Sequence, residues 1–262
     1  MTHIQETDAQ LVWHPYTSLK AGPPIHITSA HGMYLNTANG RKIMDAVSSW
    51  WVNIHGHSHP ALAEAVYKQA LTAEHIIFAG FTHEPAVTLA AKLQPLLPGN
   101  MAKFFFSDDG STAVEVALKL AMQFNYNQGI SKRKIIALEG AYHGDTFGAM
   151  SVAERNAFNA AFSPWMFDTE FLTLGPADRC PDIHTYDANQ WEPTIAAMQR
   201  ICESGDVAAF IFEPLLQGTA GMRLYPVEVL EQLLEIAEKY NVISIADEVM
   251  TGFGRTGPLF AM

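Results

Sequence analysis

The sequence has 262 residues, of which 48% are hydrophobic and 16% are charged, the balance of an ordinary globular protein. Its 16 Lys and Arg residues against 27 Asp and Glu residues give a net charge of −11, which argues against a nucleic-acid partner, because such a partner requires clustered basic residues. Two cysteines are too few for a disulfide framework, and the chain shows neither a signal peptide nor an apolar run approaching the ~20 residues that cross a bilayer, so we expect a cytoplasmic protein with no membrane partner.

The first part of the chain shows little regular patterning. Residues 1–40 are predicted to be irregular, because three prolines break up any helix. An amphipathic helix is predicted over residues 60–78, where apolar side chains recur at helical spacing after a proline. A second helix is predicted over residues 84–96.

From residue 100 onward the pattern alternates between strands and helices. The predicted strands are 103–107 (KFFFS), 134–138 (KIIAL), 207–212 (VAAFIF) and 242–246 (VISIA). The predicted helices are 113–128 and 227–240, whereas residues 155–190 are rich in turn formers and show only weak periodicity. Strands that alternate with helices indicate an α/β fold with a mainly parallel sheet flanked by helices.

Polar residues follow four of the predicted strands. They are Asp108 to Ser111, Tyr142 with His143, Glu213 to Gln217, and Asp247 with Glu248. In open parallel sheets, ligands bind outside the carboxyl ends of the strands. The convergence of these residues at one edge therefore predicts a binding site.

Each strand end has a functional and a structural interpretation. Gly110 and Ser111 open a helix, whose free N–H groups suit an anion, but Ser111 also fits an ordinary helix cap. Asp247 ends a buried strand and needs a partner there, which a pyridinium nitrogen, a metal ion, a helix cap or a salt bridge would each supply. Tyr142 could stack on a flat cofactor and Val249 could pack against its face, or both could simply be packed.

The segment around residues 50–59 is unusually rich in aromatic rings. Trp50 and Trp51 are adjacent and cannot easily both be core, so one of them is expected at a pocket or an interface. Three histidines at positions 55, 57 and 59 raise the alternative of a metal site. Their i, i+2 spacing fits no zinc signature, so no metal is expected.

Four segments in this order resemble the class III aminotransferases, which have the type I fold of the pyridoxal-phosphate-dependent transferases. The segments are DDGSTAVEVALKLA (108–121), YHGDTFGAMS (142–151), FIFEPLLQGTAGM (210–222) and IADEVMTGFGRTG (245–257). The resemblance implies pyridoxal 5'-phosphate as cofactor. It implies that Gly110 and Ser111 hold the phosphate, that Tyr142 and Val249 flank the ring, and that Asp247 pairs with the ring nitrogen.

Two N-terminal segments, WHPYTSL (13–19) and MDAVSSWWVNIHGHSHP (44–60), narrow this resemblance. They are similar to the family members that move an amino group from S-adenosylmethionine to 8-amino-7-oxononanoate, which gives 7,8-diaminononanoate in biotin synthesis. This likeness implies a homodimer in which Tyr16, Trp50, Tyr142 and Asp145 line the substrate pocket. The alternatives are another class III aminotransferase of the ω-amino acid or ornithine type, or a non-catalytic fragment.

The sequence departs from the family at its end. The family forms a Schiff base with a lysine beyond the strand that follows G-F-G-R-T-G, and no lysine follows Asp247 here. We therefore assign no catalytic residue, and we expect a C-terminally truncated chain that is inactive alone. By this interpretation residues 1–60 form an arm and the start of a small domain, residues 61–262 form an incomplete large cofactor-binding domain, and the C-terminal small domain is missing.

Overall fold

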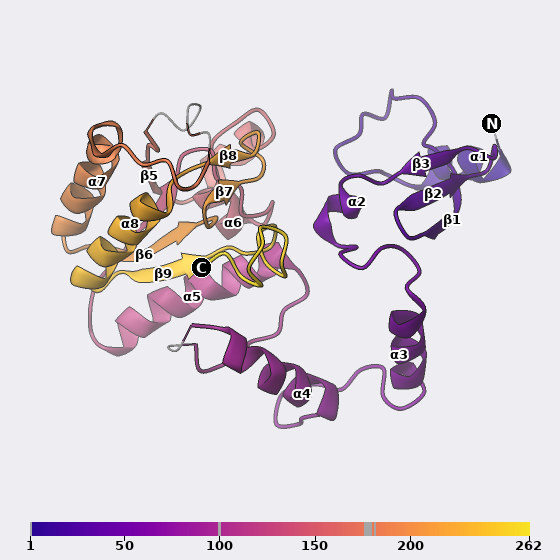
Figure 1. Cartoon of the computed structure of the whole chain (residues 1–262), viewed down its shortest axis with the longest axis horizontal. Coiled ribbons are helices and arrows are strands. Elements are labelled where there is room, and N and C mark those ends of the chain that lie inside the picture. The colour runs from indigo at the N-terminus through magenta and orange to yellow at the C-terminus, as the bar shows by residue number, and fades with distance from the viewer. Residues whose placement is uncertain (1, 99–100, 176–179, 181) are drawn as a thin grey trace. The chain divides into compact units, whose positions relative to one another are not determined.

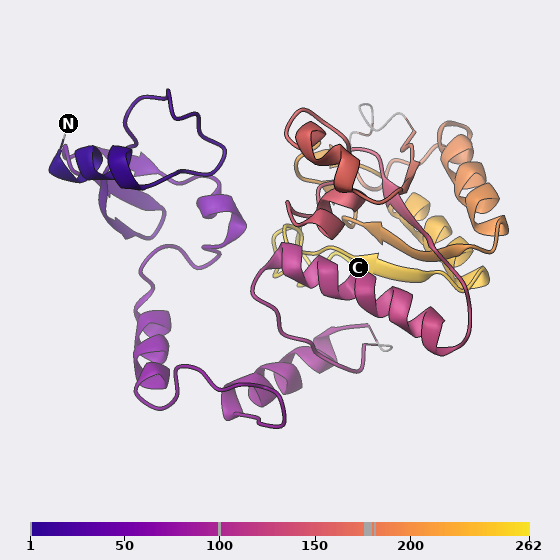
Figure 2. The same ribbon diagram turned by 180° about the vertical axis from the view of Figure 1, so that it is seen from behind.

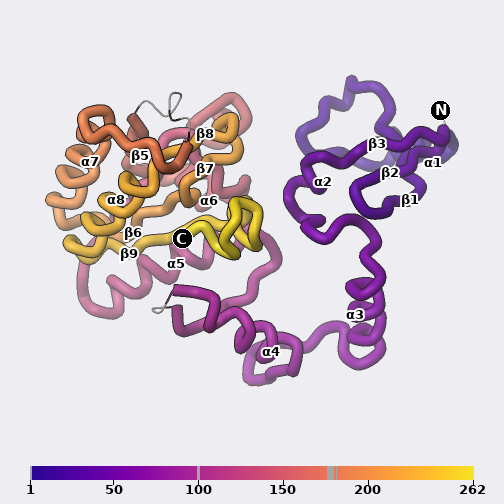
Figure 3. The backbone as a smooth tube through the Cα atoms, viewed as in Figure 1, coloured from indigo at the N-terminus to yellow at the C-terminus, as the bar shows by residue number. Residues whose placement is uncertain are grey.

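The structure, a computed structural model, describes residues 2–98, 101–175, 180 and 182–262 (Figure 1). The chain divides into two compact units, Met1–Val87 and Thr88–Met262, which are described separately. The tube drawing follows the same chain by residue number (Figure 3). The division of domains expected from the sequence stays a prediction.

The first unit holds a helix and a small sheet in the region expected to be irregular, so that expectation was wrong. Helix α1 (His3–Leu11) begins at a capping box formed by Thr2 and Gln5. Strands β1 (Ile27–His31), β2 (Tyr34–Thr37) and β3 (Lys42–Met44) pair antiparallel in that order. The prolines lie between the helix and the first strand, so they separate regular elements instead of preventing them.

Short helical segments follow the small sheet along the chain. They are α2 (Ser48–Trp51), α3 (Pro60–Ala70), α4 (Glu84–Leu93) and a 3-10 turn η1 (Gln94–Leu96). Helix α3 starts with its proline in the first turn, as predicted, but it ends eight residues before position 78. The predicted helix over 84–96 is confirmed as α4 followed by η1.

The second unit is built on a parallel sheet with the strand order β5-β4-β6-β9. The strands are β4 (Lys134–Leu138), β5 (Glu170–Leu172), β6 (Val207–Phe212) and β9 (Ile243–Ala246). The helices are α5 (Gly110–Asn127), α6 (Phe147–Val152), α7 (Ala188–Glu203) and α8 (Val227–Lys239), with a 3-10 segment η2 (Ala160–Trp165). A two-stranded ribbon, β7 (Leu216–Gln217) and β8 (Arg223–Leu224), follows β6.

The sheet is buried on both faces because helices cover each of them. Side chains alternate along each strand, so each strand contributes to both cores. Ile136 and Leu138 of β4 belong to a core shared with α7 and α8. Ile135 and Ala137 belong to a second core shared with α5 and α6. Figure 2 shows α5 against the sheet, with α7 and α8 beyond it. The predicted α/β fold with helices on both faces is confirmed.

One local prediction in this unit was wrong, and one helix was not predicted. Residues 103–107 form no strand, because among the described residues no strand runs beside them to accept their backbone hydrogen bonds, and Phe105 and Phe106 are exposed. The turn-rich residues 155–190 contain η2, β5 and the start of α7. Helix α7, which was not predicted from the sequence, contains Pro193 and packs Trp191 and Met198 on one face into the core.

No helix in the described ranges is both long enough and apolar enough to cross a membrane.

Replacing Leu233 of α8 with Ala should lower the free energy of unfolding by about 2–5 kcal/mol, because the side chain is fully buried and its removal leaves a cavity. Urea unfolding followed by circular dichroism measures this. The matched control is Leu120→Ala on α5, whose side chain is 56% exposed and should contribute little. Equal losses in the two variants would contradict the described core.

Candidate functional site

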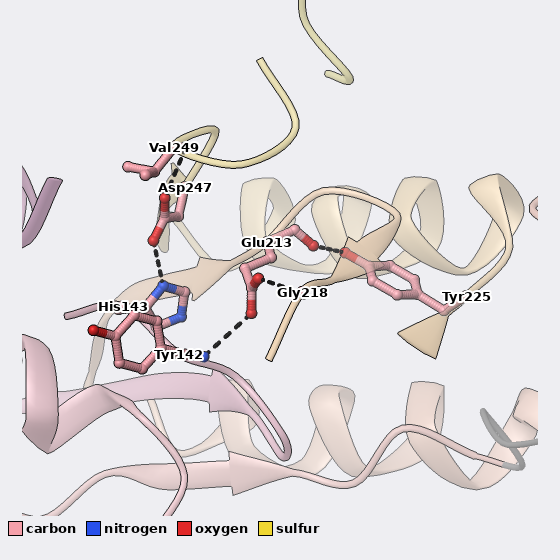
Figure 4. Close-up of polar contacts among 7 residues, drawn as sticks. All are labelled: Tyr142, His143, Glu213, Gly218, Tyr225, Asp247 and Val249. Atoms are coloured by element: carbon pink, nitrogen blue, oxygen red, sulfur yellow. Dashed lines mark hydrogen bonds and ion pairs between the residues drawn. The ribbon is translucent and has the colours of Figure 1, made fainter. Parts of the chain in front are cut away.

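The candidate site lies at the carboxyl ends of β4, β6 and β9, which are neighbours in the sheet. The loop after β4 carries Tyr142 and His143, β6 runs into Glu213, and β9 runs into Asp247. Figure 4 shows these side chains gathered at one edge of the sheet. The structure therefore brings together three of the four predicted polar strand ends, with the fourth supplied by the N-terminus of α5.

Asp247 and His143 form a buried pair at this edge. Asp247 Oδ2 lies 2.7 Å from His143 Nδ1, and the side chains are 7% and 0% exposed (Figure 4). The other carboxylate oxygen accepts the Val249 N–H at 3.1 Å, and the Asp247 N–H donates to the Phe212 carbonyl. A buried carboxylate requires such partners to stay charged, and they also fix its orientation.

The sequence predicted that His143 lies in this loop but indicated no role for it. The feature of the sequence that could have indicated a role for His143 is the polar Tyr142-His143 pair directly after a buried strand. Its Nε2 is buried and has no hydrogen-bond partner within the described residues. With Nδ1 directed at Asp247, the ring donates through the Nδ1–H, which leaves Nε2 facing the interior.

Glu213 ties three segments of the edge together. Its carboxylate accepts the Tyr142 N–H at 3.2 Å and the Gly218 N–H at 2.9 Å, and its carbonyl accepts the Tyr225 hydroxyl at 2.6 Å (Figure 4). Burial raises the pKa of Glu213 above its ordinary value, although the Gly218 N–H and the His143 ring oppose this rise. Burial likewise raises the pKa of Tyr225.

The N-terminus of α5 lies where the sequence predicted an anion-binding turn, and the binding itself stays a prediction. Asp109, and not Ser111, caps the helix, because its carboxylate accepts the Thr112 N–H at 2.8 Å. The Ser111 hydroxyl instead accepts the Thr146 N–H at 3.0 Å and lies 2.9 Å from the Thr146 hydroxyl. The alternative interpretation of Ser111 as the cap is therefore wrong.

Gly110 and Val249 lie very close together at the start of α5. A Cβ added to Gly110 would lie 2.6 Å from Val249 Cγ2, a separation that real Cβ atoms do not reach. The absence of a side chain at position 110 thus lets the loop after β9 pack over the start of α5. Val249 is nevertheless 62% exposed, so it presents an open apolar surface beside Asp247 (Figure 4).

The four predicted substrate residues form two separate pairs. The Tyr142 hydroxyl donates to Asp145 Oδ2 at 2.8 Å in the second unit. In the first unit, the rings of Tyr16 and Trp50 lie edge to face with centroids 5.4 Å apart. Both of these rings are mostly exposed, which is typical of aromatic side chains that contact a ligand or a partner surface.

Trp50 stands in an unusual stretch of backbone. Four consecutive residues have positive φ: Ser48 (51°), Ser49 (48°), Trp50 (55°) and Trp51 (69°). The left-handed region costs L-amino acids on the order of 1–2 kcal/mol per residue. Strain of this kind persists only where surrounding contacts enforce it, and it is frequent at functional sites.

The described residues contain no group of three or more His, Cys, Asp or Glu side chains placed to hold a metal ion. Of the three histidines near Trp50, His57 pairs with Asp45, and the rings of His55 and His59 stand edge to face 6.2 Å apart.

The structure is thus an α/β protein with a parallel sheet, and a buried carboxylate and a helix that begins at a glycine lie at the carboxyl edge of that sheet. Residues 16–262 match the family described as Aminotransferase class-III. The chain therefore belongs to the class III aminotransferases, a family that depends on pyridoxal 5'-phosphate.

Relatives within the family carry more specific names. The chain is 50% identical to the adenosylmethionine-8-amino-7-oxononanoate aminotransferase of Synechococcus elongatus, over 95% of this chain and 58% of that protein. It is 37% identical to the protein of the same name from Geobacter sulfurreducens, over 98% of this chain and 58% of that protein. The chain thus spans a little more than half the length of the curated relatives it matches.

Solved structures agree with the fold. The adenosylmethionine-8-amino-7-oxononanoate aminotransferase of Methanocaldococcus jannaschii superposes with a TM-score of 0.88 at 34% identity, covering 98% of this chain and 57% of that one. The omega transaminase of Pseudomonas jessenii in complex with PMP superposes with a TM-score of 0.90 at 28% identity, covering 99% and 59%.

The raised pKa of Glu213 predicts a pH dependence of stability. Because the folded protein favours the protonated acid, the stabilising contribution is present below the ordinary pKa of 4.5 and is lost as pH rises through the higher folded pKa. The wild-type chain should therefore lose stability relative to Glu213→Gln as pH rises from about 4 to 7. Urea midpoints of both chains across this range measure the difference. A difference that stays constant with pH would show that Glu213 keeps its ordinary pKa.

Proposed function

We propose that the carboxyl edge of the sheet binds pyridoxal 5'-phosphate. In this proposal Gly110 and Ser111 hold the phosphate, Tyr142 and Val249 flank the ring, and Asp247 pairs with the ring nitrogen. The observation that carries the proposal is the buried Asp247–His143 pair beside the glycine-opened start of α5. When bound, the cofactor supplies an electron sink for the bonds broken at the substrate carbon.

The donor set fits the two charged ends of such a cofactor. Asp247 has two oxygens with four lone-pair sites, of which the His143 ring and the Val249 N–H use only two. The carboxylate can therefore accept one more N–H, and its negative charge would keep that proton on a pyridine nitrogen. His143 acts on the far side of Asp247 and holds the carboxylate in place.

The phosphate end is supported by the helix and by Thr146. Helix α5 has 18 residues, and its first N–H groups carry the positive end of the helix dipole. Ser111 Oγ accepts the Thr146 N–H. When the Thr146 hydroxyl donates to Ser111 Oγ as well, the Ser111 O–H remains available to donate to an anion. Thr146 thereby orients the Ser111 hydroxyl.

We propose that the whole protein transfers an amino group from S-adenosylmethionine to 8-amino-7-oxononanoate and forms 7,8-diaminononanoate. Support comes from the names of relatives at 50% and 37% identity, together with the paired tryptophans. In this proposal Tyr16, Trp50, Tyr142 and Asp145 line the substrate pocket. We assign the Schiff-base lysine to none of these 262 residues, since the last lysine is Lys239.

Two further properties belong to the same proposal. We infer a cytoplasmic location and a homodimer for the whole protein, because biotin-pathway relatives match nearly the entire chain. A second candidate function is a transaminase that accepts ω-amino donors, since omega transaminases share the fold with a TM-score of 0.90. The amino donor therefore decides between the two candidates.

The cofactor proposal predicts that Asp247→Asn weakens binding of pyridoxal 5'-phosphate to this chain by about 10- to 100-fold, the loss expected for one hydrogen bond to a charged group. Titration followed by cofactor absorbance and protein fluorescence measures the dissociation constant. Glu231→Gln makes the same chemical change at an exposed position of α8 and should leave binding unaltered. Unchanged binding in Asp247→Asn, or equal loss in both variants, would refute the site.

The substrate proposal predicts a choice of amino donor. The enzyme expressed from the gene that encodes this chain should form 7,8-diaminononanoate from 8-amino-7-oxononanoate when S-adenosylmethionine is the donor. Mass spectrometry of the product measures turnover with S-adenosylmethionine, lysine, ornithine and β-alanine in parallel. Faster turnover with an ω-amino donor than with S-adenosylmethionine would favour the second candidate.

A further inference from the structure

We propose that Asp45, together with His57, is the positioning residue for Trp50: it holds the left-handed turn that presents the indole ring. This inference rests on the proposed function, because Trp50 lines the substrate pocket only under that proposal. Asp45 itself touches no reacting group in this scheme and acts through the backbone of the turn.

The turn cannot hold its conformation unaided. Ser48, Ser49, Trp50 and Trp51 are all L-residues in the left-handed region, where steric contact between Cβ and the next carbonyl disfavours each of them. The assigned segment α2 is a left-handed turn and not the start of a normal helix, with Ser49 at φ 48° and ψ 58°. Some other group must therefore stabilise this stretch.

Asp45 supplies that stabilisation at the centre of the turn. Its Oδ1 accepts the Ser49 N–H at 3.0 Å, and its Oδ2 accepts the Ser49 hydroxyl at 2.7 Å. His57 Nε2 lies 2.7 Å from the same Oδ2, and the Asp45 side chain is buried. The Ser49 N–H, followed by the Ser49 hydroxyl and His57, lowers the pKa of Asp45 to about 2, so the carboxylate is ionised at neutral pH.

The hydrogen-bonded pair of Asp45 and His57, which we call the brace, is bound to the three-stranded sheet. His57 exchanges backbone hydrogen bonds with Gly32, which lies in the turn between β1 and β2, at 3.1 and 2.8 Å. The Asp45 N–H donates to the Met33 carbonyl in the same turn at 2.8 Å. Both members of the pair are therefore fixed to one rigid hairpin, and the hairpin sets the position of the left-handed turn.

Trp50 depends on this arrangement because its ring is mostly exposed. The residue is 63% exposed, and its ring meets Tyr16 edge to face at 5.4 Å. An exposed ring with one aromatic neighbour gains little from packing, so the backbone under it determines where it points. Loss of the brace should let the turn relax and should displace the indole without unfolding the unit.

The test uses the 262-residue chain labelled with 5-fluorotryptophan, whose five tryptophans are assigned by Trp→Phe substitution. In Asp45→Asn and His57→Leu the Trp50 fluorine resonance should shift and broaden, whereas Trp13 in the same unit and Trp191 in the core of the second should not. His57→Gln keeps an N–H donor at the position of Nε2 and should restore the wild-type spectrum. The matched control is Asp8→Asn, which breaks the more exposed pair of Asp8 with His14 and should move Trp13 but not Trp50.

A Trp50 resonance that stays in place in both Asp45→Asn and His57→Leu would overturn the inference. Equal movement of Trp50 in Asp8→Asn would overturn it as well, because the effect would then be general. Movement of Trp13 or Trp191 together with Trp50 in the Asp45 and His57 variants would show unfolding instead of positioning.

Kinetics of the whole enzyme separate this inference from the proposed function. Asp45→Asn should raise KM by about five- to tenfold, the loss expected for one misplaced aromatic contact, with kcat little changed. Trp50→Ala should raise KM at least as much. If Trp50→Ala raises KM and Asp45→Asn does not, the inference fails. If neither variant raises KM while the fluorine resonance moves, the substrate role of Trp50 fails and the brace stands.

Discussion

The buried carboxyl group of Asp247 at the end of β9 is the constraint on which the candidate site depends. The His143 ring and the Val249 N–H each contact one oxygen of this carboxylate and fix its orientation. Val249 lies in the same loop after β9 as Asp247, whereas His143 lies in the loop after β4. The hydrogen bond between His143 and Asp247 requires the loops after β4 and β9 to meet, and the proposed cofactor site lies where they do.

The remaining residues of the edge keep those loops in register. Glu213 joins the Tyr142 backbone to Gly218, and Gly110 lets Val249 approach the start of α5. In the first unit, Asp45 has the same kind of role for the turn that carries Trp50. In all three cases a residue with a small or ionisable side chain determines where an aromatic or apolar side chain lies.

The sequence could predict the elements whose pattern is locally complete. Strands β4 and β6 were predicted at their observed bounds, because fully buried strands read as unbroken apolar runs. Residues 103–107 were mispredicted because strand formation depends on a neighbour that local pattern does not reveal. His143 and Asp45 went unassigned for a similar reason, since each gains its role from a partner 104 or 12 residues away. Charge and spacing alone do not encode such pairings.

The most direct test of this account is a crystal structure of the enzyme grown with pyridoxal 5'-phosphate. We predict phosphate density at the N–H groups of Gly110 and Ser111, the ring between Tyr142 and Val249, and the ring nitrogen within hydrogen-bond distance of Asp247, with His143 still on the opposite side of that carboxylate. Cofactor density elsewhere, or a ring nitrogen that faces a group other than Asp247, would contradict the account.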